Sequence, residues 1–501
     1  MRAQLSIAGG VREFAAATPS AIAVIDGDRK LSYAALHDRS SRLANALLSL
    51  GLLPGDTVAL LLANQLEYPE AAAGLAKAGL VMVPLNPRLT PPEIAFVVDH
   101  SRARALIVDA ALADLAGTAA DILETTLKNV LVTGSGGSYE AALSFAPGSD
   151  PRVSVSELDP FCVAYTSGTT GDPKGVVISH RSRALTFYAS ALEWGLGPGR
   201  RSIAVAPMYH GAGFAFGYAA IHTGGTVSML RSWDPDRLLA MIEKDRAQSV
   251  FMVPTHAQTI RALGDLVLRR SDLSSLDTLF FNAAALPVPL KEWVLDTFPG
   301  VGVHELYGST EAGIITNLRP ADARSKAGSV GHPWFMTEVR IVNDAGVPVP
   351  AGTPGELFSR SPYLMNGYLR NPEATKACTT DDGFLTSGDI AVSDDEGFIR
   401  IVDRKKDLII SGGVNVYPRD VEIAIDGCPG VTESAVVGER DETWGERVVA
   451  YVVGDASAAE IEAHLRPRIA GYKIPKIIHF IPKLPRNSAG KVLKRELRKE
   501  A

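Results

Sequence analysis

The chain has 501 residues, of which 46% are hydrophobic and 21% charged, and its formal net charge is −6. This length predicts two or more domains, and the weakly acidic balance argues against nucleic acid as a partner. The cysteines, Cys162, Cys378 and Cys428, are too far apart in sequence to suggest a disulfide framework or a zinc site, which is typical of a reduced, cytoplasmic protein.

From the N-terminus, short apolar runs alternate with helical patterns. Residues 57–64, 80–87, 105–109 and 129–134 are expected to be strands, and residues 68–79 a helix. Nearly all-apolar strands separated by helices predict parallel sheets covered by helices. The apolar runs are far too short to span a bilayer, so we expect no integral membrane segment. The turn-rich stretch 135–160 is expected to be a loop.

Beyond residue 335 the pattern changes to short alternating strands separated by Gly, Pro and Asp. Residues 339–360 and 382–404 therefore predict β-hairpins of a small β-rich subdomain. A helix near 418–428, followed by strands near 434–439 and 446–453, predicts a small α+β unit at the end of the chain. We place the boundary in the charged stretch 403–406, giving an α/β protein with a large N-terminal domain (1–403) and a small C-terminal domain (404–501).

The stretch YTSGTTGDPKG (165–175) has the composition of a phosphate-binding loop, with glycines, hydroxyl side chains and one lysine. It is not a Walker A loop, because Pro173 precedes the lysine and Gly175 stands where a Mg²⁺-binding hydroxyl is required. Taken alone, the stretch could also be a flexible polar surface loop. If it binds phosphate, the metal ligand must come from elsewhere in the chain.

Further motifs follow in order: YGSTEAG (307–313), TSGD (386–389), DRKKDLIISGG (403–413) and PRNSAGKVLKREL (485–497). With these motifs the chain resembles the acyl-adenylate-forming, ATP-dependent AMP-binding superfamily, in particular acyl-CoA synthetases of the 4-coumarate- or benzoate-CoA ligase type. The resemblance implies that a carboxylate attacks the α-phosphorus of ATP, releasing pyrophosphate, and that a thiol then displaces AMP. It also implies ATP, Mg²⁺ and CoA as co-substrate, and a small C-terminal domain that rotates between the two steps.

The resemblance assigns roles residue by residue. The loop would hold the β- and γ-phosphates, Tyr307 would stack on adenine, and Asp389 would accept hydrogen bonds from the ribose. The candidate ATP- and AMP-binding residues are Thr166, Ser167, Gly168, Thr169, Thr170, Gly171, Lys174, Ala283, Ala284, Glu305, Tyr307, Gly308, Asp389 and Arg404.

The remaining roles concern catalysis, the acid and CoA. Glu311 would bind Mg²⁺ and so supply the metal ligand that the loop lacks, and Lys491 would stabilise charge transfer from carboxylate to phosphate. The candidate catalytic residues are Lys491, Thr310, Glu311 and His210, with Lys406 as hinge; the acyl-pocket candidates are His210, Phe214, Asn282 and Gly308; the CoA candidates are Gly412, Gly413, Tyr472, Lys473 and Lys476. At 282–284 this chain carries Asn-Ala-Ala where the family stretch is richer in glycine, so the pocket is expected to be slightly narrower.

Three activities are weighed on this basis. The first is a CoA ligase for an aromatic or medium-chain fatty acid, since the pocket segment 207–217 contains no arginine that would pair a second carboxylate. The second is a stand-alone enzyme that loads an acyl or aryl group onto a carrier protein, and the third is a non-catalytic nucleotide-binding protein. The expected partners are a small carboxylate, ATP and CoA, with a homodimer as a possible assembly.

Overall fold

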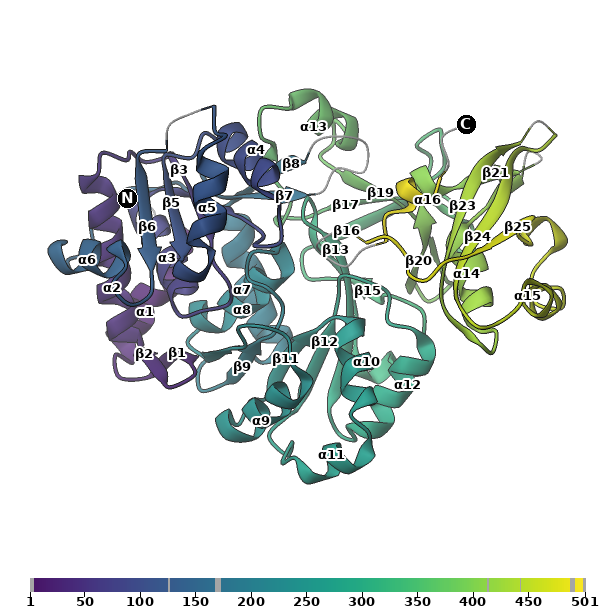
Figure 1. Cartoon of the computed structure of the whole chain (residues 1–501), viewed down its shortest axis with the longest axis horizontal. Coiled ribbons are helices and arrows are strands. Elements are labelled where there is room, and N and C mark those ends of the chain that lie inside the picture. The colour runs from purple at the N-terminus through teal and green to yellow at the C-terminus, as the bar shows by residue number, and fades with distance from the viewer. Residues whose placement is uncertain are drawn as a thin grey trace. The chain divides into compact units, whose positions relative to one another are not determined.

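The computed structural model describes residues 4–124, 127–166, 173–411, 414–441, 443–486 and 492–498. The chain folds into two compact units (Figure 1): residues 1–339 with 359–385, and residues 340–358 with 386–501. The predicted α/β class, with a large N-terminal part and a smaller C-terminal part, is confirmed. The boundary predicted between residues 403 and 404 falls inside the second unit, because the strand that ends at Arg404 pairs with the strand Leu385–Ser393. The predicted division of the ATP and acyl sites (1–403) from the catalytic lysine (404–501) stays a prediction.

The larger sheet of the first unit has nine strands in the described part of the chain. In order across the sheet its strands are β2 (Arg29–Ser32), β1 (Ile22–Asp26), β10 (Thr226–Met229), β9 (Arg201–Ala204), β11 (Ser249–Met252), β12 (Thr278–Phe281), β13 (Gly302–Ser309), β14 (Gly313–Leu318) and β15 (His332–Pro333). The strands from β1 to β13 are parallel, and β2, β14 and β15 add antiparallel edges.

A second sheet in the same unit carries the strands predicted from the N-terminal half. Its order is β6 (Asn129–Thr133), β5 (Ala105–Asp109), β3 (Thr57–Leu61), β4 (Val81–Pro84), β7 (Pro160–Thr166), β8 (Lys174–Ser179) and β18 (Gly367–Tyr368). The strands from β6 to β7 are parallel, and β8 and β18 are antiparallel to their neighbours. Every residue of β5 is buried, as expected for a parallel strand covered on both faces.

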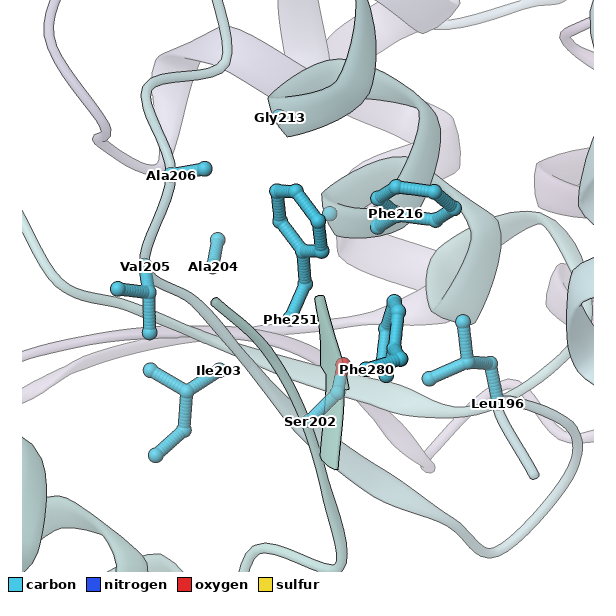
Figure 2. A pocket seen from close by; sticks show the side chains of 11 residues that line it. Leu196, Ser202, Ile203, Ala204, Val205, Ala206, Gly213, Phe216, Phe251 and Phe280 are labelled. Carbon is cyan, nitrogen blue, oxygen red and sulfur yellow. The ribbon is translucent and has the colours of Figure 1, made fainter. Parts of the chain in front are cut away.

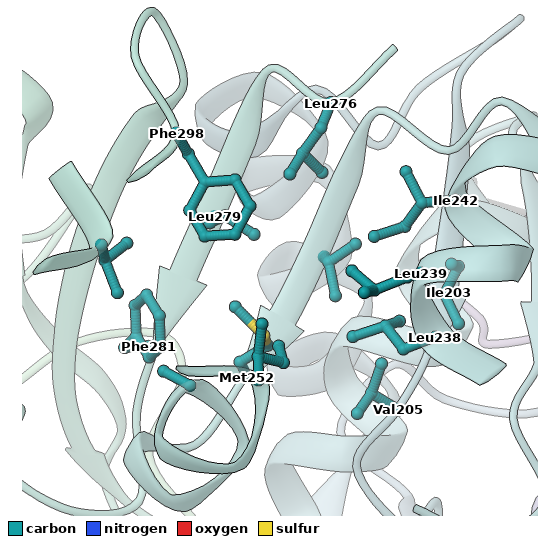
Figure 3. Close-up of a cluster of buried hydrophobic side chains, with 14 of the residues drawn as sticks. Ile203, Val205, Leu238, Leu239, Ile242, Met252, Leu276, Leu279, Phe281 and Phe298 are labelled. Atoms are coloured by element: carbon teal, nitrogen blue, oxygen red, sulfur yellow. The ribbon is translucent and has the colours of Figure 1, made fainter. Parts of the chain in front are cut away.

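Helices cover these sheets (Figure 1). They are α1 (Gly9–Ala17), α2 (Tyr33–Ser49), α3 (Glu67–Ala78), α4 (Pro91–Ser101), α5 (Ala113–Ala120), α6 (Ser138–Phe145), α7 (His180–Trp194), α8 (Gly211–His222), α9 (Pro235–Asp245), α10 (Pro254–Ala262), α11 (Asp265–Arg270), α12 (Val288–Thr297) and α13 (Pro372–Cys378). Apolar burial joins the layers: Ile242 of α9 packs in one cluster with Met252 of β11 and Phe281 of β12 (Figure 3).

Helix α6 corrects the prediction that residues 135–160 form a loop. Tyr139 and Leu143 lie four residues apart on this helix and are both buried, which gives it an apolar face. The turn-forming glycines of the stretch end at Gly137, immediately before the helix begins. The rest of the stretch has no helix or strand until β7 begins at Pro160.

The second unit is built around antiparallel strands. One sheet has the order β16 (Glu338–Val342), β17 (Gly355–Arg360), β19 (Leu385–Ser393) and β20 (Ile399–Arg404), which confirms the predicted hairpins. Another has the order β22 (Val414–Val416), β21 (Ile409–Ser411), β24 (Gly445–Gly454) and β23 (Val431–Asp441), with β25 (Ile477–Phe480) parallel to β24. The helices are α14 (Pro418–Asp426), α15 (Ala458–Leu465) and α16 (Lys494–Leu497). Among the helices in the described ranges, none is long and apolar enough to cross a membrane.

Candidate active site

The phosphate-loop candidate is held at both ends by the hairpin of β7 and β8. Thr166 pairs with Lys174 in the register of these strands, and its hydroxyl donates a 3.5 Å hydrogen bond to the carbonyl of Lys174. The hairpin therefore fixes the two flanks from which the loop leaves the sheet. The loop residues Ser167, Gly168, Thr169, Thr170 and Gly171 lie outside the described residues.

The β13–β14 hairpin presents Thr310 and Glu311 on its turn. A Cβ atom on Gly308 would lie 2.0 Å from the carbonyl oxygen of Gly313, so only glycine permits this close approach of the two strands. The Ser309 hydroxyl accepts a 3.0 Å hydrogen bond from the amide of Ala312, which closes the turn. Both Thr310 and Glu311 are half-buried, and so is Tyr307 just before the turn.

A residue that the sequence did not single out joins these two hairpins. The hydroxyl of Tyr368 donates a 3.0 Å hydrogen bond to Oε1 of Glu311, and the Nζ atom of Lys174 lies 5.1 Å from the centre of the Tyr368 ring. Burial, followed by the negative charge of Glu311, raises the pKa of the Tyr368 phenol, so the hydroxyl stays protonated and donates. The structure thus brings the predicted phosphate lysine and the predicted metal carboxylate to one side chain.

His210 lies at the N-terminus of α8, close to the same turn. A Cβ atom on Gly211, the next residue, would lie 3.7 Å from the hydroxyl oxygen of Thr310. The imidazole of His210 packs on the ring of Tyr209, with ring centres 4.7 Å apart. Burial, and to a smaller extent the positive charge of Arg88, lowers the pKa of His210 to about 4. The imidazole is therefore neutral near pH 7.

Phe214, one turn into α8, is buried in an aromatic cluster. Its ring centre lies 5.1 Å from that of Tyr218 and 5.6 Å from that of Phe161. A separate cavity of about 10 Å³ is lined by Phe216 of the same helix and by Phe251, and Phe214 is not among its lining residues (Figure 2). This volume holds about one water molecule and no carboxylic acid. The assignment of Phe214 to the acyl pocket stays a prediction.

The stretch 282–286 lies between β12 and α12. Ala283 has a φ of 74°, a left-handed conformation that glycine adopts without strain. The backbone amide of Ala283 donates a hydrogen bond to the side-chain oxygen of Asn282. Ala283 and Ala284 are exposed. Glu305 of β13, a predicted nucleotide-binding residue, is buried; its Oε1 accepts a 3.1 Å hydrogen bond from the amide of Leu286. Glu305 therefore holds this stretch against the sheet.

In the second unit, the predicted ribose residues are neighbours across β19 and β20. Asp389 and Arg404 are register partners, and Nε of Arg404 lies 2.7 Å from Oδ1 of Asp389. The side chain of Asp389 is 5% exposed and that of Arg404 is 34% exposed, so the carboxylate is buried and the guanidinium is accessible. Lys406, the predicted hinge, is exposed and lies two residues after the end of β20.

The predicted CoA residues are spread over the second unit. Tyr472 is 45% exposed, Lys473 forms a 3.0 Å ion pair with Asp420, and the side chain of Lys476 is exposed. Gly412, Gly413 and the predicted catalytic Lys491 lie outside the described residues. Their roles stay predictions.

Comparison with known proteins identifies the family. Residues 11–369 match the family described as AMP-binding enzyme, and residues 420–491 match the AMP-binding enzyme C-terminal domain. The chain belongs to the AMP-binding enzyme family. It is 40% identical to a feruloyl-CoA synthase from Amycolatopsis over 96% of both chains, and 35% identical to the long-chain-fatty-acid–CoA ligase FadD13 from Mycobacterium tuberculosis over 94% of this chain and 93% of that one. Its structure superposes on ATP-bound MatB from Rhodopseudomonas palustris with a TM-score of 0.90 and 30% identity, covering 98% of each chain.

These relatives establish the reaction class of this AMP-binding enzyme. It is an acid–thiol ligase that forms acyl-CoA with ATP, Mg²⁺ and CoA. In the first unit, Glu311 supplies one carboxylate on the turn between β13 and β14. A single carboxylate such as Glu311 suits Mg²⁺, which is commonly bound by one or two carboxylates together with substrate phosphates and water.

Proposed function

We propose that the acid is aromatic, of the cinnamate or benzoate type, with a medium-chain fatty acid as the second candidate. The observation that carries this choice is the 40% identity to a feruloyl-CoA synthase along nearly the whole chain. The fatty-acid alternative is supported by the 35% identity to FadD13. The neutral imidazole of His210, packed on Tyr209 beside Thr310, is suited to an uncharged, flat group next to the reacting carboxylate.

In the proposed site the first unit holds the triphosphate. Lys174 would place its ammonium on the β- and γ-phosphates, Thr310 would donate to the α-phosphate, and Glu311 would hold Mg²⁺. When bound, this ion neutralises charge on the phosphate oxygens. Tyr307, half-buried at the end of β13, would contact adenine. Glu305, whose carboxylate is already bonded within the protein, would act by holding the 282–286 stretch that we assign to the acid and adenine.

The second unit would supply the ribose contact and the lysine for charge transfer. Asp389 would accept hydrogen bonds from the ribose hydroxyls, with Arg404 keeping its carboxylate oriented. Lys491 would bridge the carboxylate and the α-phosphate as charge moves between them. Lys406 would be the hinge for the second step, in which the thiol of CoA displaces AMP, with Gly412, Gly413, Tyr472, Lys473 and Lys476 along the CoA path.

A carboxylate panel tests the substrate assignment. Ferulate, 4-coumarate, benzoate, octanoate, palmitate and malonate would be compared by pyrophosphate release and by the mass of the CoA thioester. We expect the highest kcat/KM with a hydroxycinnamate or benzoate. Because the positive charge of Arg88 acts on both Tyr209 and His210, malonate would also be assayed with Arg88→Ala. Activity confined to the dicarboxylate would overturn the proposal, and its loss in Arg88→Ala would assign the second carboxylate to that arginine.

The acceptor is tested in the same assay. We propose free CoA as the acceptor, and loading of a carrier protein as the alternative. Thioester formation with CoA but not with a phosphopantetheinylated carrier protein is the expected result. A cytoplasmic location and a homodimer are further proposals that rest on the sequence; sedimentation at several concentrations tests the second.

A further inference from the structure

The segment 365–369 ties the strand that carries Lys174 to the turn that carries Glu311. Strand β18 pairs antiparallel with β8, with Tyr368 opposite Val176, so Tyr368 is diagonal to Lys174 across the two strands. The amide of Leu369 donates a 2.7 Å hydrogen bond to the carbonyl of Gly175. At the other end, the amide of Met365 donates a 2.8 Å hydrogen bond to the carbonyl of Glu311.

The side chain of Tyr368 also contacts both Glu311 and Lys174. Its hydroxyl donates to the Glu311 carboxylate at 3.0 Å, and the Lys174 ammonium lies 5.1 Å from its ring centre. Its own backbone is held from a third side, because its amide donates a 2.9 Å hydrogen bond to the hydroxyl of Thr375 in α13. A side chain fixed in this way sets both the direction of the carboxylate and the position of the ammonium.

We propose that Tyr368 is a positioning residue for the Mg²⁺·triphosphate end of ATP, with separable roles for its hydroxyl and its ring. The hydroxyl orients Glu311 and leaves the other carboxylate oxygen for the metal. The ring supports the Lys174 ammonium by a cation–π contact. This inference rests on the proposed roles of Lys174 and Glu311, and it adds that one phenol couples them.

Binding of ATP without any acid tests the proposal, because no turnover occurs. Calorimetric titrations of ATP would be made in EDTA and over a series of free Mg²⁺ concentrations. For Tyr368→Phe we expect unchanged ATP affinity in EDTA and an Mg²⁺ midpoint raised about 10-fold, as is typical when an outer partner of a metal ligand is lost. For Tyr368→Leu we expect the same rise, together with about 2- to 5-fold weaker ATP binding in EDTA, since the ring is also lost.

Tyr363→Phe is the matched control. Tyr363 lies in the same stretch of chain and is 2% exposed, and within the described residues its hydroxyl has no hydrogen-bond partner. This variant should bind ATP like the unmodified chain at every Mg²⁺ concentration. If Tyr368→Phe leaves the Mg²⁺ midpoint unchanged, or weakens ATP binding equally with and without Mg²⁺, the proposal is wrong. An unmodified chain that binds no ATP would overturn the proposed nucleotide site itself.

Discussion

The Nζ atom of Lys291 lies 2.5 Å from Oε2 of Glu305, and the two side chains are only 1% and 5% exposed. The other carboxylate oxygen of Glu305 accepts the amide of Leu286. This pair therefore couples α12, β13 and the 282–286 stretch that borders the proposed acid site. A charge so deeply buried is tolerated only while its partner is present.

Removing one member of this pair should lower the free energy of unfolding far more than removing both. Glu305→Ala leaves the Lys291 ammonium buried without a counter-charge, and we expect the free energy of unfolding to fall by about 3–5 kcal/mol. The double variant Lys291→Met with Glu305→Leu buries no charge, so its free energy of unfolding should fall clearly less. Urea unfolding of the three chains measures this difference. Equal losses in the single and double variants would contradict the argument.

Replacing Ala283 by glycine should stabilise the protein. The φ of 74° at Ala283 strains an L-residue, and relief of that strain outweighs the greater freedom of glycine in the unfolded chain. We expect the free energy of unfolding to rise by roughly 1 kcal/mol or less. Ala285→Gly, in the same stretch but without a positive φ, is the control and should be destabilising. Thermal unfolding of both variants shows whether each substitution raises or lowers the stability.

Asp389 should account for recognition of the ribose hydroxyls. If its carboxylate accepts them, ATP will be preferred over 2′,3′-dideoxy-ATP in pyrophosphate release, and Asp389→Ala should remove most of a preference of about 10- to 100-fold. Asp344→Ala, which changes a 95% exposed carboxylate of the same unit, should retain the preference. An unmodified chain that uses both nucleotides equally well would refute this role.

Lys491→Ala should separate the two half-reactions. We expect loss of acid-dependent pyrophosphate exchange, because the transition-state charge is no longer stabilised, while much of the thioester formation from supplied acyl-adenylate remains. Lys483→Ala, at an exposed lysine of the same unit, should affect neither step. Equal loss of both steps in Lys491→Ala would show that this lysine does not act selectively in adenylation.

Buried histidines should make the protein sensitive to mild acid. Burial lowers the pKa of His180, His222 and His304 to about 4, below the value of about 6.5 expected in the unfolded chain. Between these values the unfolded state binds more protons, so stability falls as the pH drops from 6.5 toward 4. His222→Gln should reduce the slope by at most about 1.4 kcal/mol per pH unit. Denaturant unfolding at several pH values measures the slopes, and an unchanged slope would contradict the assignment to His222.

Local patterns predicted most of the fold. The run 105–109 predicts a strand with the bounds that β5 has, because a nearly all-apolar segment of that length is suited to a covered parallel sheet. Helix α6 was missed because glycines just before it obscured the i, i+4 spacing of Tyr139 and Leu143. This error thus lies where turn-forming residues adjoin a short helix.

The sequence offers candidates for the site mainly where the residues lie in motifs, and their roles stay predictions. Thr310 and Glu311 stand on the same turn and were found together, whereas Tyr368 reaches Glu311 from 57 positions further along the chain. Nothing local marks such a residue, since its partners are set by the pairing of β18 with β8. Glu305 shows the converse. The resemblance suggests a nucleotide contact for it, whereas in the structure its carboxylate lies against the Lys291 ammonium and accepts the amide of Leu286.

The late position of β18 in the chain has a consequence for synthesis. Until residues 367–368 leave the ribosome, the outer edge of β8 has no strand to pair with, and an unpaired edge next to an apolar sheet favours association between chains. Nearly three-quarters of the 501 residues must therefore be made before this edge is covered. The proposed phosphate end of the site is completed at the same moment, so a chain that stalls before residue 367 should lack this end and should be prone to aggregate.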